Sequence, residues 1–300
     1  MVSDELVRRF AQIALSPDPD LAVAALTIAR LEYPKIDIAR YLGELDRMGN
    51  EAALRVSATR AGSQVAPAHV DPEAFAKLTA LNDYLFGEQR FVGNDLEYED
   101  PRNSFLNQVL ERRTGIPITL ALVYIEVARR AGLRLEGINF PGHFLVRCPV
   151  RAGRQFSRDL IIDAFHGGSF LSEEACRELL RKHAGQEETW GPHLLEQATK
   201  PQILARMLLN LKRVYVGMYS FPQARDITEL LLAVDPTATS ELRDRGLLAY
   251  QLNDLSAALR DLQTYLQLSP KTELDDDDRQ EREQIWEHVK SIKRRVASFN

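Results

Sequence analysis

Apolar residues recur at helical spacing along the first part of the chain. Leu6, Phe10 and Ile13 share one face of a helix, and similar spacings of three and four residues continue beyond them. The pattern fades over residues 57–71, a polar stretch that contains glycine and proline and few large apolar side chains. Such a stretch predicts an exposed connection. We therefore expect a helical N-terminal segment over residues 1–66.

The pattern resumes at Pro72 and changes its period within the next region. A long apolar run opens at Pro117, and proline suits the first turn of a helix because its missing N–H would have no partner there. Since the run is apolar on most of its circumference, we expect a buried central helix. Short runs of β-forming residues follow, such as Leu160-Ile-Ile-Asp163, and they predict a small antiparallel sheet. Helices followed by such a sheet predict an α+β domain over residues 67–195.

The last third of the chain is helical and repeats itself. Ala224 recurs as Ala258 and Pro236 recurs as Pro270, each 34 residues later. A small residue within the unit and a closing proline at this period are typical of the tetratricopeptide repeat. Stacked helical repeats of this kind form concave binding surfaces. We expect a tetratricopeptide-like helical domain over residues 196–300, with a protein or peptide partner, so that the whole chain is mostly helical α+β.

Composition and charge exclude several classes of partner. Of the 300 residues, 38 are basic and 43 are acidic, which gives a net charge of −5 and no surplus of cations for a nucleic-acid backbone. The longest uncharged run, residues 114–125, is shorter than the roughly 20 residues of a membrane span. The chain begins without the apolar core of a secretion signal. Cys148 and Cys176 lack a metal- or disulfide-type spacing. We expect a cytoplasmic protein with no nucleic acid, membrane or cofactor.

The middle region places three elements of a catalytic layout in order. Pro117 opens the central helix, His143 precedes one predicted strand, and Asp163 ends the next. A helix N-terminus lowers the pKa of a nucleophile placed there. A neighbouring histidine can take the proton of that nucleophile, and a carboxylate can orient the imidazole. A cysteine at the start of the helix would make this layout a Cys-His-Asp triad.

Five separated segments of the chain resemble one bacterial family. They are Phe91-Val-Gly-Asn94, Asn103-Ser-Phe-Leu-Asn-Gln-Val109, Arg113-Thr-Gly-Ile-Pro-Ile-Thr119, Phe140-Pro-Gly-His-Phe-Leu-Val146 and Ile162-Asp-Ala-Phe-His-Gly-Gly168. In this order, and followed by the repeats, they resemble the SirB-type proteins, which join a transglutaminase-like domain to tetratricopeptide repeats. Some F-box proteins carry a similar module. The resemblance implies a transglutaminase-like, cysteine-proteinase-like α+β fold.

The resemblance also implies that the parent chemistry is lost. Its catalytic histidine and aspartate match His143 and Asp163, whereas its nucleophilic cysteine falls on Pro117. A proline ring cannot attack a carbonyl, so the resemblance implies a pseudoenzyme that acts as a protein-binding or regulatory module. In that case His143 and Asp163 are vestigial and hold two strands together. The alternative is a hydrolase or peptidase-like enzyme that uses this pair with water, with the Thr119 hydroxyl or with a metal.

Further polar residues have two interpretations. Asn94, Asn103 and Ser104 match recurrent positions of the family, and they either order the loop over the cleft or line a peptide-binding groove. Asn103 or Ser104 is also placed to cap the next helix. His166 follows Asp163 at the spacing Asp-x-x-His, so an alternative to our expectation of no metal is a site built from His143, Asp163 and His166.

The remaining histidines, His183 among them, lie in polar surroundings without ligand spacing and are expected at the surface. The last predicted helix offers Ile285, Trp286 and Ile292 as contacts for a homo-oligomer. Self-association of this kind would be compatible with a binding role.

Overall fold

The computed structural model describes most of the chain, and its packing divides the chain into two compact units. The described residues are 2–59, 65–149, 158–184, 189–269 and 276–298. One unit comprises Ser16–Met207, and the other joins Met1–Leu15 to Leu208–Asn300. The division falls inside helix α8, Lys200–Gly217. Packing thus groups the chain differently from the three segments suggested by composition, because the first fifteen residues belong with the repeats.

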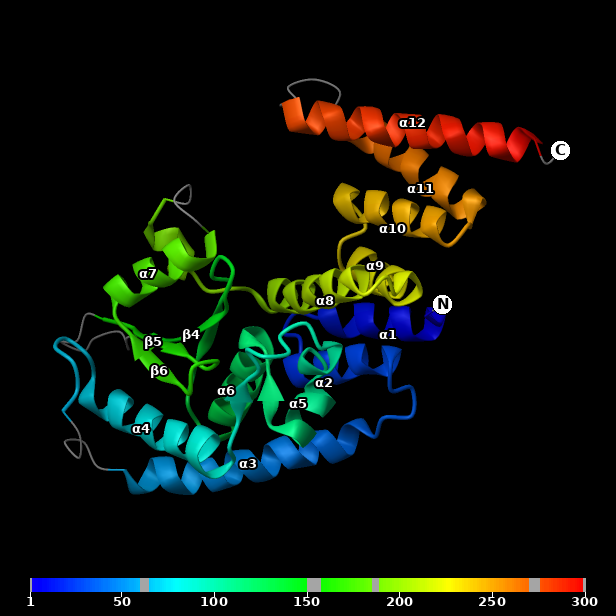
Figure 1. The fold of residues 1–300 in the computed structure, drawn as a ribbon. Coiled ribbons are helices and arrows are strands. Elements are labelled where there is room, and N and C mark those ends of the chain that lie inside the picture. Colours follow the sequence, from blue (N-terminus) through cyan, green and yellow to red (C-terminus); the bar gives the residue numbers. More distant parts are fainter. Residues whose placement is uncertain (1, 60–64, 150–157, 185–188, 270–275, 299–300) are drawn as a thin grey trace. The chain divides into compact units, whose positions relative to one another are not determined.

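The Ser16–Met207 unit combines helices with a small sheet (Figure 1). Its α-helices before the main sheet are α2 (Leu21–Ile28), α3 (Ile38–Ala58), α4 (Pro72–Asn82), α5 (Leu106–Arg112) and α6 (Pro117–Arg130). Three short helical segments lie between these helices: the 3-10 helices η1 (Ala29–Leu31) and η3 (Pro101–Asn103), and the π-helical η2 (Asp83–Glu88). The sheet is followed by α7 (Glu173–Ala184), η4 (Pro192–Leu195) and the start of α8.

Helix α6 is the centre of this unit, as its apolar sequence predicts. All of its residues from Pro117 to Ala128 are buried. Helix α3 packs against it, and strands β3 (Glu136–Ile138) and β4 (Leu145–Cys148) also contact it. Pro117 occupies the first turn, where its missing N–H leaves no partner unsatisfied. The buried helix therefore fixes the position of its own N-terminus, next to which the resemblance places a nucleophile.

The main sheet has four antiparallel strands in the order of the sequence. They are β3 (Glu136–Ile138), β4 (Leu145–Cys148), β5 (Leu160–Asp163) and β6 (Ser169–Leu171). Val146 pairs with Gly137 on one side and with Ile162 on the other, which sets the register. Side chains such as Leu145 and Ile161 join Leu180 of α7 in one apolar cluster. The predicted antiparallel pairing of β4 with β5 is confirmed.

Two features of this unit differ from the sequence-based expectations. Strands β1 (Val92–Gly93) and β2 (Thr114–Gly115) form a short parallel pair, which no alternation of polar and apolar residues in the sequence predicts. The expected cap of α5 is also wrong: the helix begins after Phe105, which makes no side-chain cap. Asn103 instead ends the η3 turn. The reason is that the Asn103 amide is used within the preceding loop, as described below.

The second unit contains the repeats. Helix α1 (Asp4–Ala14) packs against α9 (Phe221–Val234), which is followed by α10 (Thr239–Gln251), α11 (Leu255–Leu268) and α12 (Asp276–Ser298). Each of these helices contacts the next one along the chain from α9 to α12. Ala224 and Ala258, the small residues that recur after 34 positions, are both fully buried. Pro270 lies outside the described residues.

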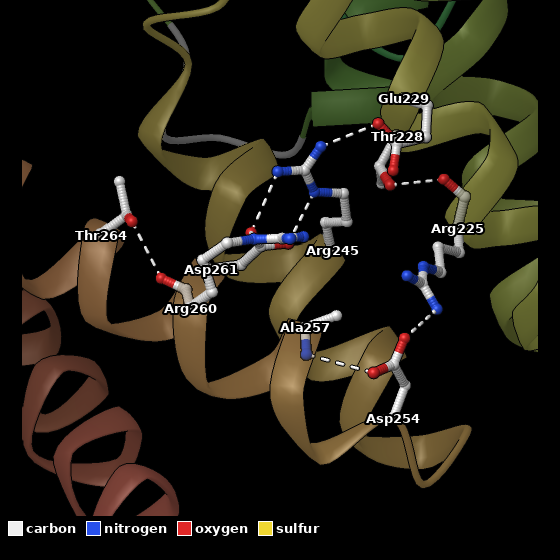
Figure 2. A network of polar contacts seen from close by, with 9 residues as sticks. All are labelled: Arg225, Thr228, Glu229, Arg245, Asp254, Ala257, Arg260, Asp261 and Thr264. Atoms are coloured by element: carbon white, nitrogen blue, oxygen red, sulfur yellow. Dashed lines mark hydrogen bonds and ion pairs between the residues drawn. The ribbon is translucent and has the colours of Figure 1, made fainter. Parts of the chain in front are cut away.

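Charged side chains tie these repeat helices together (Figure 2). The Arg245 guanidinium on α10 donates to both oxygens of Asp261 on α11, at 2.6 and 3.0 Å. It also donates to Glu229 on α9, at 2.8 Å. A second pair joins Arg225 to Asp254, at 3.1 Å. Asp261 is only 2% exposed, so the buried charge of its carboxylate depends on the hydrogen bonds from Arg245.

The apolar face of the last helix packs within its own chain. Ile285 and Ile292 are 3% and 0% exposed and belong to the apolar cluster of α10, α11 and α12. The expectation that these two residues form an oligomer contact is therefore wrong. Ile285, Val289 and Ile292 recur at helical spacing, so they share the face of α12 that packs against the chain. Trp286 remains 45% exposed. No helix in the described part of the chain combines the length and apolar character needed to cross a membrane.

Candidate functional site

The site is built where two strands of the main sheet begin and end. His143 lies just before β4, and its carbonyl accepts a hydrogen bond from the Arg206 side chain at 3.1 Å. Asp163 is the last residue of β5. Because β4 and β5 are antiparallel neighbours, the start of one strand lies beside the end of the other. The sheet thus brings together the two residues that the sequence singles out.

His143 and Asp163 form a buried pair. The Nε2 atom of His143 lies 3.0 Å from each carboxylate oxygen of Asp163, and the two side chains are 3% and 2% exposed. Asp163 Oδ1 also accepts the backbone N–H groups of Phe165 and His166, at 3.0 and 3.3 Å. Nδ1 of His143 has no hydrogen-bond partner among the described residues. The carboxylate therefore fixes the ring through Nε2 and leaves the other nitrogen open.

The environment of Asp163 keeps its carboxylate ionised. Burial alone would raise its pKa, but the hydrogen bond from His143 and the charges of His143 and His166 outweigh burial, so the pKa is lowered from the ordinary value of 3.8. At neutral pH the group is an anion that can orient an imidazole. This electrostatic arrangement is the one that a catalytic His-Asp pair uses.

A third residue, His166, completes a cluster around the carboxylate. Its Nδ1 atom lies 2.7 Å from Asp163 Oδ2. Donor atoms of His143, Asp163 and His166 all lie within 4.8 Å of one another. The His166 side chain is 46% exposed, whereas the other two are buried. The cluster therefore opens to solvent on the side of His166.

His183 is a neighbour of the site that the sequence did not reveal. Its ring lies 5.6 Å from the His143 ring between centroids, at an interplanar angle of 24°. Gly142, at φ +65°, permits this approach, because a Cβ there would lie 2.4 Å from the Cβ of His183. The pKa of His183 is lowered by burial and by the charge of His143. His183 is exposed as expected, yet it also packs on the central histidine.

Phe165 connects the site to the loop that follows β1. Its ring meets His143 edge-on at 6.0 Å, and Tyr98 meets it edge-on at 6.1 Å. Asn103 shapes this loop, since its amide donates to the Glu97 carbonyl at 2.7 Å and its Oδ1 accepts from Asn94 at 3.2 Å. Asn103 and Ser104 are 0% and 2% exposed. These contacts favour the loop-ordering role over a groove-lining one.

The first turn of α6 carries one candidate nucleophile, the Thr119 hydroxyl, and its hydrogen bonds go to groups other than His143. The Thr119 hydroxyl is fully buried, donates to the Asn103 carbonyl at 2.7 Å and accepts from the Ile116 N–H at 3.1 Å. No hydrogen bond joins Thr119 to His143 among the residues that the structure describes. The bond with Ile116 is the local one expected of a first-turn threonine, and the bond to Asn103 joins the helix start to the preceding loop. Thr119 therefore serves to close the α6 N-terminus.

The two cysteines occupy other parts of the fold. Cys176 on α7 is 0% exposed within the cluster that contains Leu145 and Ile161, and burial raises its pKa to about 11. Cys148 lies on β4 opposite Leu160. A thiol with a pKa near that of Cys176 is protonated at neutral pH and is a poor nucleophile.

Comparison with known proteins defines the class of this chain. A profile described as Transglutaminase-like superfamily matches residues 39–209, more than half of the chain, and a profile described as Tetratricopeptide repeat matches residues 211–289. The fold and the paired His143 and Asp163 thus occur in a transglutaminase-like domain followed by tetratricopeptide repeats. The expected fold class is confirmed.

Individual relatives identify the family within that class. A UPF0162 protein of Xylella fastidiosa is 40% identical over 277 residues, which cover 91% of this chain and 92% of the relative. A UPF0162 protein of Pseudomonas aeruginosa is 30% identical over 251 residues, 84% of this chain and 85% of the relative. F-box only protein 21 of Mus musculus is 36% identical over 166 residues, 53% of this chain and 25% of that protein. The chain belongs to the UPF0162 family, the SirB-type group expected from the five segments.

Proposed function

We propose that this chain is a non-catalytic, protein-binding or regulatory member of the transglutaminase-like superfamily. The observation that carries the proposal is Pro117. It stands at the first position of the buried helix α6, where the resemblance places the nucleophilic cysteine. Proline has no side-chain atom that can attack an acyl carbon or lose a proton. The proposed function therefore does not include acyl transfer through a thiol at this position.

The placement of the two cysteines supports the same conclusion. Cys176 is buried among apolar side chains with a pKa of about 11, which keeps it a neutral thiol at pH 7. Cys148 is a strand residue whose backbone pairs with Leu160. Cys148 lies on a strand, and Cys176 lies in the first turn of α7, where burial nevertheless raises its pKa. Both are reduced, in keeping with a cytoplasmic setting, which belongs to the proposal.

In this proposal His143 and Asp163 serve the fold. A buried imidazole needs a hydrogen-bond partner whether or not it takes part in catalysis. The pair joins the turn before β4 to the end of β5, and the carboxylate also binds the two backbone amides that start the turn after β5. Removing Asp163 would leave the buried His143 ring without the hydrogen-bond partner that it has in the structure.

The partner surface of the proposal lies on the repeats, a class of structure that generally mediates protein–protein interaction. Between α11 and α12 lies a groove of about 690 Å³. Its lining includes the apolar Leu266 and Trp286 together with charged side chains, Arg282 and Glu283. An aromatic anchor beside charged groups is a composition that protein interfaces favour. We propose a protein or peptide as the occupant and no nucleic acid, and we leave self-association as a property to be measured.

The proposal is tested by assaying the purified chain for hydrolysis and acyl transfer on glutamine-containing peptides and on simple amides and esters. The matched control is His143→Ala. We expect equal rates for the two proteins, at the level of buffer alone. Turnover by the wild-type chain that is lost in His143→Ala would contradict the proposal.

A second candidate function has one observation in its favour. His143 is oriented by an ionised carboxylate through Nε2, and Nδ1 has no protein partner among the described residues. A ring held in this way could take a proton from water, as in a hydrolase that dispenses with a thiol. In the same assay, this function predicts turnover that requires His143 and Asp163 and survives alkylation of both cysteines.

A further inference from the structure

We propose that His143, Asp163 and His166 form a binding site for one divalent transition-metal ion. This inference goes beyond the proposed function, because ion binding at the sheet and protein binding at the repeats are measured separately. Two imidazoles and one carboxylate are a donor set that zinc, iron and similar ions accept, with coordination positions left for water or a ligand.

The distances between the donor atoms suit a single ion. Asp163 Oδ2 lies 2.7 Å from His166 Nδ1 and 3.0 Å from His143 Nε2, and donor atoms of all three residues lie within 4.8 Å of one another. Zinc binds imidazole nitrogen and carboxylate oxygen at about 2.0–2.2 Å, so its ligands lie roughly 3–3.5 Å apart. Small rotations of the two rings would open the cluster to that spacing.

The surroundings hold the donors in place, as the outer shell of a metal site does. The backbone N–H groups of Phe165 and His166 both donate to Asp163 Oδ1, at 3.0 and 3.3 Å, and hold the carboxylate so that Oδ2 lies within reach of both imidazoles. The Phe165 ring packs edge-on against both imidazoles, at 6.0 Å from His143 and 5.1 Å from His166. Contacts of this type fix ligand orientation and raise metal affinity.

The cluster also provides an entry path. His143 and Asp163 are nearly fully buried, whereas the His166 side chain is 46% exposed and stands at the solvent side. A site with a buried carboxylate and one exposed ligand lets an ion enter without opening the sheet. Because His166 is the exposed ligand, its removal should weaken binding while disturbing the fold less than removal of His143 or Asp163.

The test is a titration of the tag-free, chelator-treated full chain with zinc alone, read by competition with a chromophoric chelator. We expect one zinc ion per chain, and His166→Ala and His166→Gln should each weaken binding at least about tenfold. The matched control is His193→Ala, because His193 is an exposed histidine of the same unit that lies in the η4 turn. Its affinity should equal that of the wild-type chain.

Three results would overturn the inference: no stoichiometric binding by the wild-type chain, unchanged affinity in both His166 variants, or equal loss in His193→Ala. Circular dichroism of each variant checks its fold, and the two His166 replacements guard against a defect peculiar to one of them. Failure of zinc binding would leave the peptide, amide and ester assay of the proposed function unaffected.

Discussion

Two buried aspartates, one in each unit, are compensated by different chemistry. Asp261 in the repeats and Asp163 in the transglutaminase-like domain are each 2% exposed. Asp261 receives two hydrogen bonds from the Arg245 guanidinium (Figure 2). Asp163 receives two backbone amides and faces two imidazoles, at 3.0 and 2.7 Å.

The difference separates a scaffold from a responsive centre. A guanidinium stays charged at every pH at which proteins fold, so the Arg245–Asp261 pair is fixed. An imidazole changes its charge near neutral pH and can exchange a proton or bind a metal. The domain therefore has groups capable of chemistry around Asp163, even though proline stands where the resemblance places a nucleophile. The following predictions test this contrast, from the largest expected effect to the smallest.

Removing the carboxylate of Asp261 should cause the largest loss of stability. Asp261→Ala leaves the Arg245 guanidinium, which is 18% exposed, with Glu229 as its remaining partner in this network. We expect the free energy of unfolding to fall by about 3 kcal/mol, because Arg245 keeps its bond to Glu229 but loses both hydrogen bonds to Asp261 in a largely buried position. Urea unfolding measures the loss.

The matched control for that variant is Arg225→Ala. Its partner Asp254 is 39% exposed, so we expect a loss of about 1 kcal/mol or less. Equal losses in the two variants would show that the Arg245–Asp261 pair is not the fixed scaffold that we infer.

Gly142→Ala should disturb the histidine cluster. Gly142 has φ +65°, and a Cβ there would lie 2.4 Å from the Cβ of His183. We expect a loss of about 2 kcal/mol from backbone strain and overlap. Gly246→Ala in the repeats is the comparison, because its Cβ would also meet a side chain, Leu262 Cδ2 at 2.7 Å, but Gly246 does not have the positive φ of Gly142. A loss in Gly246→Ala as large as that in Gly142→Ala would refute this difference; thermal unfolding measures both.

The charge of Asp163 should make stability depend on pH in acid. Its pKa is lowered from 3.8 in the folded chain, so its contribution is present above the unfolded pKa and is lost as pH falls through the folded pKa. The difference in unfolding free energy between the wild-type chain and Asp163→Asn should therefore shrink as pH is taken below about 4. A difference that stays constant on acidification would contradict the hydrogen-bonded, ionised state described here.

Sequence reasoning captured the features that local patterns encode. The first-turn proline of α6, the strand Leu160–Asp163 and the 34-residue recurrence of Ala224 as Ala258 all follow from spacing and residue type. The pairing of His143 with Asp163 follows from strands that are adjacent in sequence, since antiparallel neighbours bring a start beside an end. These predictions rest on short stretches of sequence, and the structure confirms the helix start, the strand and the pairing.

The features that were missed arise from packing between distant segments. His183 reaches His143 because α7 packs on the sheet, and nothing in its own surroundings signals this contact. Strand β6, Ser169–Leu171, is too short to show alternation and depends on β5 for its hydrogen bonds. Ile285 and Ile292 are offered by the sequence as contacts for a second copy, whereas in the structure they pack against apolar residues of α10 and α11.

The central claim is that Pro117 takes the place of a transglutaminase nucleophile, and the most direct measurement is the thiol pKa in Pro117→Cys, read from the ultraviolet absorbance of the thiolate. This readout does not need reagent access to position 117, which is buried. If position 117 faces His143, the helix N-terminus and the imidazole should together lower the pKa of the introduced thiol. We predict that this pKa is lower by at least about one unit in Pro117→Cys than in Pro117→Cys combined with His143→Ala. Equal pKa values in the two variants would contradict the account, because position 117 would then not face the histidine.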